Sequence, residues 1–138
     1  MNEMTTFIKR KAKQLEADTI NIRTHLHEHP ELSSKEYETV KYLKKRIIAL
    51  GLEIEDVPNS TGFTALLDTG KQGKTLGIRA DIDALPIEEH PNNLAGPRKV
   101  ISKNKGVMHA CGHDGHMAIV LSTMEILVEM KSELTGKV

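Results

Sequence analysis

A short segment, residues 106–121, concentrates side chains that can bind a metal ion or react with a substrate. It offers three imidazoles, the only thiol of the chain and a carboxylate: His109, His113, His116, Cys111 and Asp114. If residues 109–113 run extended, alternate side chains project to the same side and bring imidazole and thiolate together. These two ligand types suit a borderline-soft ion such as zinc. The clustering therefore predicts a metal site in this segment.

Two other interpretations of Cys111 stay open. A lone cysteine is usually a small buried hydrophobe. Alternatively, Cys111 could be a nucleophile that His113 or His109 activates. The sequence marks no dedicated oxyanion site, whereas Gly112 and Gly115 allow the backbone to turn tightly around an ion. We therefore favour metal binding.

Two carboxylates, Asp81 and Asp83, end a segment in which apolar and polar residues alternate, Thr75-Leu-Gly-Ile-Arg-Ala-Asp-Ile-Asp83. The alternation predicts a strand with both carboxylates on one face near its end. Strand ends are common positions for sites in α/β sheets. Like charges this close repel unless a cation, an arginine or a proton intervenes. A solvated edge pair is the alternative, and the Cys/His segment downstream favours a functional pair.

A third group, His25, His27 and His29, occupies alternate positions at the end of a predicted amphipathic helix over residues 7–26. Residues two apart on a helix do not share a face. We therefore expect these histidines to cap and pack rather than to bind metal. Pro30 marks the expected helix end.

The remaining pattern predicts an α/β fold in which helices pack on a mixed β-sheet. A capping box at Ser33–Glu36 opens a second helix that Gly51 ends. The other expected elements are strands near 52–57 and 63–67, a long polar loop at 88–105, and a final helix from about Asp114 to Val128.

Composition excludes several classes of partner. The chain has 138 residues and 15.3 kDa, which fits one domain. A formal net charge of zero and 3% aromatic residues give no basis for binding nucleic acid or an anionic membrane. No apolar run is as long as a membrane span, and no signal-peptide pattern begins the chain. A thiol kept for a metal needs a reducing compartment, so we expect a cytoplasmic protein.

Two motifs, Arg79-Ala-Asp-Ile-Asp-Ala-Leu-Pro86 and Met108-His-Ala-Cys-Gly-His-Asp-Gly-His116, together resemble the M20 metallopeptidase family. The resemblance is to the amidohydrolase branch with hippurate hydrolases and N-acyl-amino-acid deacylases. It implies a two-metal hydrolase of amide bonds in N-acyl amino acids or small peptides. By motif, Cys111 and His113 look like metal ligands and Asp83 like the supporting carboxylate of the catalytic centre. The metal could be zinc, manganese, cobalt or nickel.

The resemblance also implies that residues 1–138 are the N-terminal part of a catalytic domain. In the family, the general-base glutamate, two further histidine ligands and a lid domain that often carries homo-oligomer contacts lie beyond the position of Val138. We therefore expect this chain alone to be inactive. A non-enzymatic metal- or partner-binding module from a truncated gene is the alternative.

Overall fold

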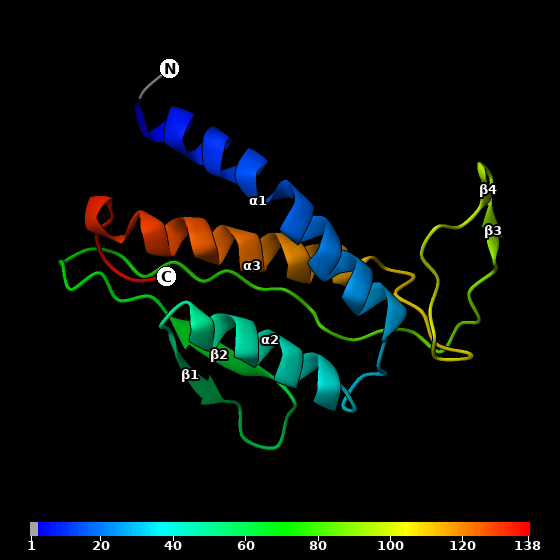
Figure 1. The fold of residues 1–138 in the computed structure, drawn as a ribbon. Coiled ribbons are helices and arrows are strands. Elements are labelled where there is room, and N and C mark those ends of the chain that lie inside the picture. The colour runs from blue at the N-terminus through cyan, green and yellow to red at the C-terminus, as the bar shows by residue number, and fades with distance from the viewer. Residues whose placement is uncertain (1–2) are drawn as a thin grey trace.

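The computed structural model describes residues 3–138. Its elements, labelled in Figure 1, are α1 (Glu3–Glu28), α2 (Tyr37–Ala49), β1 (Glu53–Asp56), β2 (Phe63–Leu66), β3 (Asn92–Asn93), β4 (Gly96–Pro97), α3 (His113–Glu129) and a 3-10 turn, η1 (Lys131–Glu133). The α/β class is confirmed, and so are the three predicted helices.

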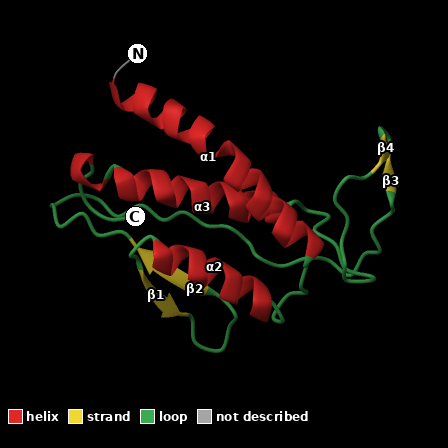
Figure 2. Ribbon diagram, in the orientation of Figure 1, coloured by secondary structure: helices red, strands yellow, loops and turns green. Residues whose placement is uncertain are grey.

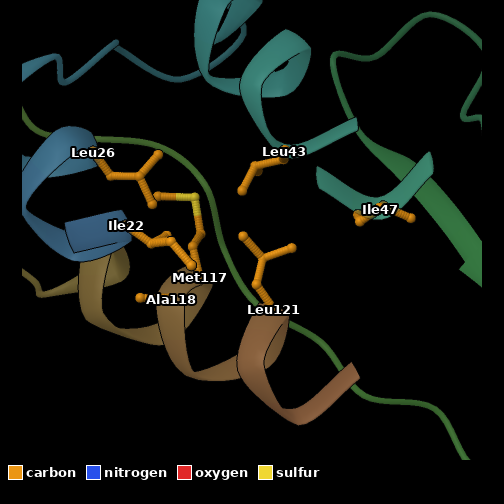
Figure 3. Packing of buried hydrophobic residues seen from close by; sticks show 7 residues of the cluster. All are labelled: Ile22, Leu26, Leu43, Ile47, Met117, Ala118 and Leu121. Atoms are coloured by element: carbon orange, nitrogen blue, oxygen red, sulfur yellow. The ribbon is translucent and has the colours of Figure 1, made fainter. Parts of the chain in front are cut away.

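The three helices meet in one apolar core. α1 lies along α3, while α2 and the β1–β2 ribbon lie on the other side of a long extended stretch of chain (Figures 1 and 2). The core side chains come from all three helices (Figure 3): Ile22, Leu26, Leu43, Ile47, Met117, Ala118 and Leu121. Each fully buried aliphatic side chain contributes about 1.5–3 kcal/mol. Packing of the predicted apolar stripes therefore fixes the start of α3 against α1.

The sheets are smaller than the sequence suggested. β1 pairs with β2 in antiparallel register, with Glu53 opposite Leu66, and β3 pairs with β4. Parallel pairing occurs in residues 3–138 only as isolated bridges, Leu32 with Ala84 and Thr75 with Lys137. The predicted packing of helices against strands is present, but the strands of the described residues form only two short antiparallel ribbons.

The segment 75–83 is extended and nevertheless joins no ladder. At its start the Leu76 N–H donates to the Lys137 carbonyl at 2.9 Å, and just beyond its end the Ala84 N–H donates to Glu31 at 2.7 Å. The prediction of a ladder strand here is wrong, because no strand within the described residues lies alongside residues 77–83 to exchange hydrogen bonds.

The end of the described chain closes onto this region through two glycines. Val138 and Leu67 exchange backbone hydrogen bonds of 2.9 and 3.0 Å. Beside them the backbone of Gly136 passes so close to residues 73–74 that an added Cβ would lie 2.0 Å from the Lys74 carbonyl oxygen. A Cβ on Gly73 would likewise lie 2.6 Å from the Gly136 nitrogen. Neither position has room for a side chain.

The start of α2 differs from its predicted capping box. The N-cap residue is Glu36, and its side chain makes no capping hydrogen bond. The carboxylate of Glu31 instead accepts from the N–H groups of Glu38 and Thr39, at 3.2 and 2.8 Å. Those groups would otherwise be unsatisfied at a helix N-terminus. Gly51 ends the helix with φ +76°, as the sequence predicts.

None of the helices formed by residues 3–138 combines the length and the apolar character needed to cross a membrane.

Candidate metal centre

The predicted ligands Cys111 and His113 lie on either side of the N-cap residue of α3. That residue, Gly112, has φ +86°, a conformation that side chains disfavour, and it turns the chain into the helix. Cys111 is exposed and His113, the first helical residue, is partly buried. A thiol and an imidazole are thus both presented at the start of one helix.

The two carboxylates of the extended segment approach His113. Its Nδ1 lies 3.0 Å from Asp83 Oδ1 and 2.9 Å from the Asp83 carbonyl oxygen. Its Nε2 lies 4.0 Å from Asp81 Oδ2. The prediction that both carboxylates share one face is therefore confirmed. Because Nδ1 faces only oxygens of Asp83, it carries the proton and donates, which leaves the Nε2 lone pair available to a metal.

Asp81 has its own cation. Arg79 Nε and Nη2 donate to Asp81 Oδ1 at 2.9 and 2.7 Å. These hydrogen bonds and the guanidinium charge lower the pKa of Asp81. Arg79 therefore relieves the repulsion expected between Asp81 and Asp83, and the Asp81 carboxylate remains ionised.

These residues fit a metal in kind but not in number. Thiolate, imidazole and carboxylate suit a divalent transition metal, and a catalytic zinc usually takes three protein ligands. Yet residues 3–138 contain no group of three or more His, Cys, Asp or Glu side chains arranged to hold an ion. We therefore regard four residues as part of a metal centre and term them the half-site: Asp81, Asp83, Cys111 and His113.

A buried polar cluster that the sequence did not reveal lies next to the half-site. His27 Nδ1 lies 2.8 Å from Asp114 Oδ2, and His27 Nε2 lies 2.9 Å from Glu89 Oε1. Arg23 Nε reaches the same Asp114 oxygen at 2.8 Å. One signal was available: Arg23 and His27 are four residues apart on α1 and so share a face. Glu89 carried no signal, since it lies in the polar loop.

Charge and burial act in opposite directions within this cluster. The hydrogen bond to Asp114 raises the pKa of His27 and, with help from Glu89, outweighs the opposing effect of burial. Burial alone would raise the pKa of Glu89, but hydrogen bonds from the Ser102 N–H and from His27 outweigh it and lower that pKa. His27 is therefore stabilised as an imidazolium between two carboxylates.

The other histidines near the half-site differ in their surroundings. His109 is buried, and neither ring nitrogen has a hydrogen-bond partner. Burial lowers its pKa and so favours the neutral ring. His116 is exposed, with its ring centroid 5.9 Å from that of His113. The clustering on which the metal prediction was based thus includes two rings that do not join the half-site.

The capping and packing role expected for the histidines of α1 is confirmed. His25 stacks on Tyr42 with ring centroids 4.2 Å apart. His29 Nδ1 donates to the His25 carbonyl at 2.8 Å and so caps the helix end. His27, between them, packs in the interior.

A groove of about 950 Å³ lies between α2, β2, α3 and the extended segment. Most of its lining is apolar, for example Leu43, Phe63 and Met124. Asp81, Asp83 and His113 also line it. Three of the four half-site residues therefore face an open, largely apolar groove, and Cys111 does not line it.

Comparisons with known proteins agree with the motifs. The profile of peptidase family M20/M25/M40 matches residues 77–138. N-acetyl-L-cysteine deacetylase of Bacillus subtilis (strain 168) is 43% identical over 124 residues, covering 90% of this chain and 29% of that protein. N-acyl-L-amino acid amidohydrolase of Geobacillus stearothermophilus is 41% identical over 132 residues, covering 95% of this chain and 34% of that protein.

Solved structures have the same fold over this region. A putative aminohydrolase from methicillin-resistant Staphylococcus aureus superposes with a TM-score of 0.88 at 45% identity, covering 96% of this chain and 33% of the other. The Bacillus subtilis protein YXEP, described as a dinuclear metal-binding peptidase of the M20 family, gives a TM-score of 0.80 at 44% identity, covering 91% and 34%. The chain thus spans about a third of the length of these relatives.

Proposed function

Because this chain belongs to the peptidase family M20/M25/M40, we propose that it supplies part of the centre of a metal-dependent hydrolase of amide bonds in N-acyl amino acids or small peptides. The observation that carries the proposal is the arrangement of His113, with Nδ1 bonded to Asp83 and Nε2 left free beside Asp81.

Each residue of the half-site has a role in this proposal. Cys111 and His113 act as metal ligands through the thiolate and Nε2. Asp83 is the supporting carboxylate, since it fixes the tautomer and orientation of the imidazole. Asp81, kept ionised by Arg79, adds negative charge beside the ligand. When bound, two divalent ions would polarise the scissile carbonyl and activate a water molecule.

The general base and the remaining ligands, in this proposal, come from sequence outside these 138 residues. Residues 1–138 then act as the N-terminal part of the catalytic domain and do not hydrolyse substrate alone. The metal is zinc, manganese, cobalt or nickel, and the protein is cytoplasmic.

Titration of the 138-residue chain with Co²⁺ tests the half-site directly. Thiolate coordination gives a charge-transfer absorption that should be present in the wild type and absent in Cys111→Ser. His113→Ala should weaken binding strongly. The matched control is His116→Ala, an exposed histidine on the same helix, which should bind as the wild type does.

Hydrolysis of hippurate and N-acetyl amino acids by the same samples tests the activity. We expect no metal-dependent hydrolysis above the blank. Hydrolysis that disappears in Cys111→Ser would contradict the predicted inactivity. Absence of a thiolate band would contradict the ligand assignment. If hydrolysis is observed, its loss on treatment with a thiol alkylator but not with a chelator would favour the cysteine nucleophile.

A further inference from the structure

We propose that His27 is a positioning residue for the candidate metal ligands: by joining Glu89 to Asp114 it fixes the first turn of α3, and with it Cys111 and His113. This inference rests on the proposed function, because it takes Cys111 and His113 to be the ligands. His27 itself touches neither of them through any hydrogen bond found in the structure.

The first turn of α3 has no side-chain cap of its own. Its N-cap residue is Gly112, which has no side chain to form a capping hydrogen bond. The N-terminal turn of a helix begins with unsatisfied N–H groups and frays readily without such partners. Asp114, in this turn, is only 1% exposed and directs its carboxylate to Arg23 and His27 on α1. The position of the turn therefore depends on α1.

His27 holds that carboxylate from a ring that is itself fixed at both ends. Nδ1 lies 2.8 Å from Asp114 Oδ2 and Nε2 lies 2.9 Å from Glu89 Oε1. Carboxylates accept, so both nitrogens donate to them, while Arg23 Nη2 also lies 3.1 Å from Nδ1. An imidazole that donates from both nitrogens is an imidazolium, and two carboxylates define its rotation. The second oxygen of Glu89 accepts from the Ser102 N–H at 2.6 Å. One ring thus connects α1, the loop at 88–105 and α3.

The link from this ring to the half-site is covalent and short. Asp114 directly follows His113, whose own Nδ1 is bonded to Asp83. The imidazole of His113 is therefore held by Asp83 at the ring and by Asp114 through the backbone. Metal–ligand distances in proteins lie within about 0.2 Å of fixed values, so a ligand must be placed accurately. Loss of supporting contacts outside the ligands typically lowers metal affinity about 10–100-fold.

A purely structural role for the cluster would lower stability without altering the half-site in molecules that remain folded. A measurement on the metal-free protein distinguishes this structural role from the positioning role. Imidazole nitrogen NMR reports which nitrogen of His113 carries the proton. It should show Nδ1–H in the wild type and mixed tautomers in His27→Asn, since the turn no longer holds His113 against Asp83.

The variants are His27→Asn and Glu89→Gln, each in the full 138-residue chain. His29→Asn is the matched control, an exposed histidine directly after the end of α1. We expect His27→Asn to bind Co²⁺ about tenfold more weakly than the wild type. Glu89→Gln, which loses one of two acceptor oxygens, should show a smaller change in the same direction. His29→Asn should match the wild type in both measurements.

The proposal is overturned if a folded His27→Asn protein keeps the wild-type tautomer of His113 and the wild-type Co²⁺ affinity. Should His27→Asn fail to fold, the same two readouts on Glu89→Gln decide the question. If the wild type itself binds no Co²⁺, the proposed function fails, while the His113 tautomer still tests the positioning role separately.

Discussion

Two neighbouring groups of charged side chains, the half-site and the buried cluster, differ in how completely they are satisfied. In the buried cluster His27, Glu89 and Asp114 are all at most 5% exposed, and each has a charged partner within 2.9 Å. In the half-site Asp81 has a side-chain exposure of 45%, and no three ligands in residues 3–138 converge.

This difference suggests that the buried cluster stabilises the fold and that the half-site is the group available for binding. Buried charges persist in a fold when every partner is present, because an unpaired buried charge is strongly unfavourable. The half-site keeps unsatisfied ligand atoms at the surface of a groove, where they can bind something else. The first group should therefore control stability, and the second should control metal binding.

The largest expected effect is on the buried cluster. Asp114→Ala leaves His27 and Arg23 without their shared carboxylate and should lower the free energy of unfolding by about 3–5 kcal/mol. Urea denaturation measures the loss. Asp81→Ala is the matched carboxylate deletion in the half-site and should lower the free energy of unfolding much less, because its side chain is solvated. Equal losses in the two variants would remove the distinction between the groups.

A second effect depends on pH. Because the pKa of His27 is raised on folding, its stabilising contribution is complete below its ordinary value and is lost as pH rises through the folded pKa. The free energy of unfolding of the wild type should thus exceed that of His27→Asn most near pH 5–6. The excess should fall towards pH 9, by no more than about 1.4 kcal/mol per pH unit.

The contribution of Glu89 to the free energy of unfolding depends on pH in the opposite direction and is lost at acid pH. Its pKa is lowered on folding, so its contribution is present above its ordinary value and is lost as pH falls through the folded pKa. Glu89→Gln should therefore reduce the loss of stability on acidification. A His27→Asn difference that grows above pH 7 would contradict this account of the cluster.

The smallest expected effect is at the rim of the half-site. Arg79 is 88% exposed at its side chain, so Arg79→Ala should leave the free energy of unfolding nearly unchanged. The same substitution should raise the pKa of Asp81 towards its ordinary value, which carboxyl NMR measures directly. A large loss of stability would place Arg79 with the buried cluster instead.

The sequence predicted the helices because each buries one stripe of its surface, and the regular spacing of Leu43 and Ile47, or of Met117 and Leu121, records that burial. It also predicted that Asp81 and Asp83 share a face, since alternation is a property of any extended chain. The prediction that residues 75–83 join a β-ladder was wrong. Strand pairing needs a neighbouring strand, and the alternation of residues within one segment does not reveal whether such a strand exists.

Residue type and motif identified the candidate ligands in the sequence. The buried residues that hold them in place were not identified in this way. Glu89 looked like one more acidic residue in a polar loop, and its burial depends on α1, from which it is 61 or more residues distant in sequence. The N-terminal cap of α2 was misassigned for a similar reason. Ser33 fits the local pattern, but Glu31 has the geometry that reaches the helix N–H groups. Sequence spacing does not determine long-range contacts such as that of Glu89. It also does not decide between neighbouring residues, such as Ser33 and Glu31, that could make the same contact.

The contact between Gly73 and Gly136 has a consequence for how the chain opens. It places two glycine backbones against each other and so adds no side-chain burial, whereas α1 and α3 are joined through the apolar core around Ile22 and Met117. Segments with few buried apolar contacts open at a lower free energy than the core. We therefore expect Leu67 and Val138 to exchange their amide hydrogens faster than the core of α3.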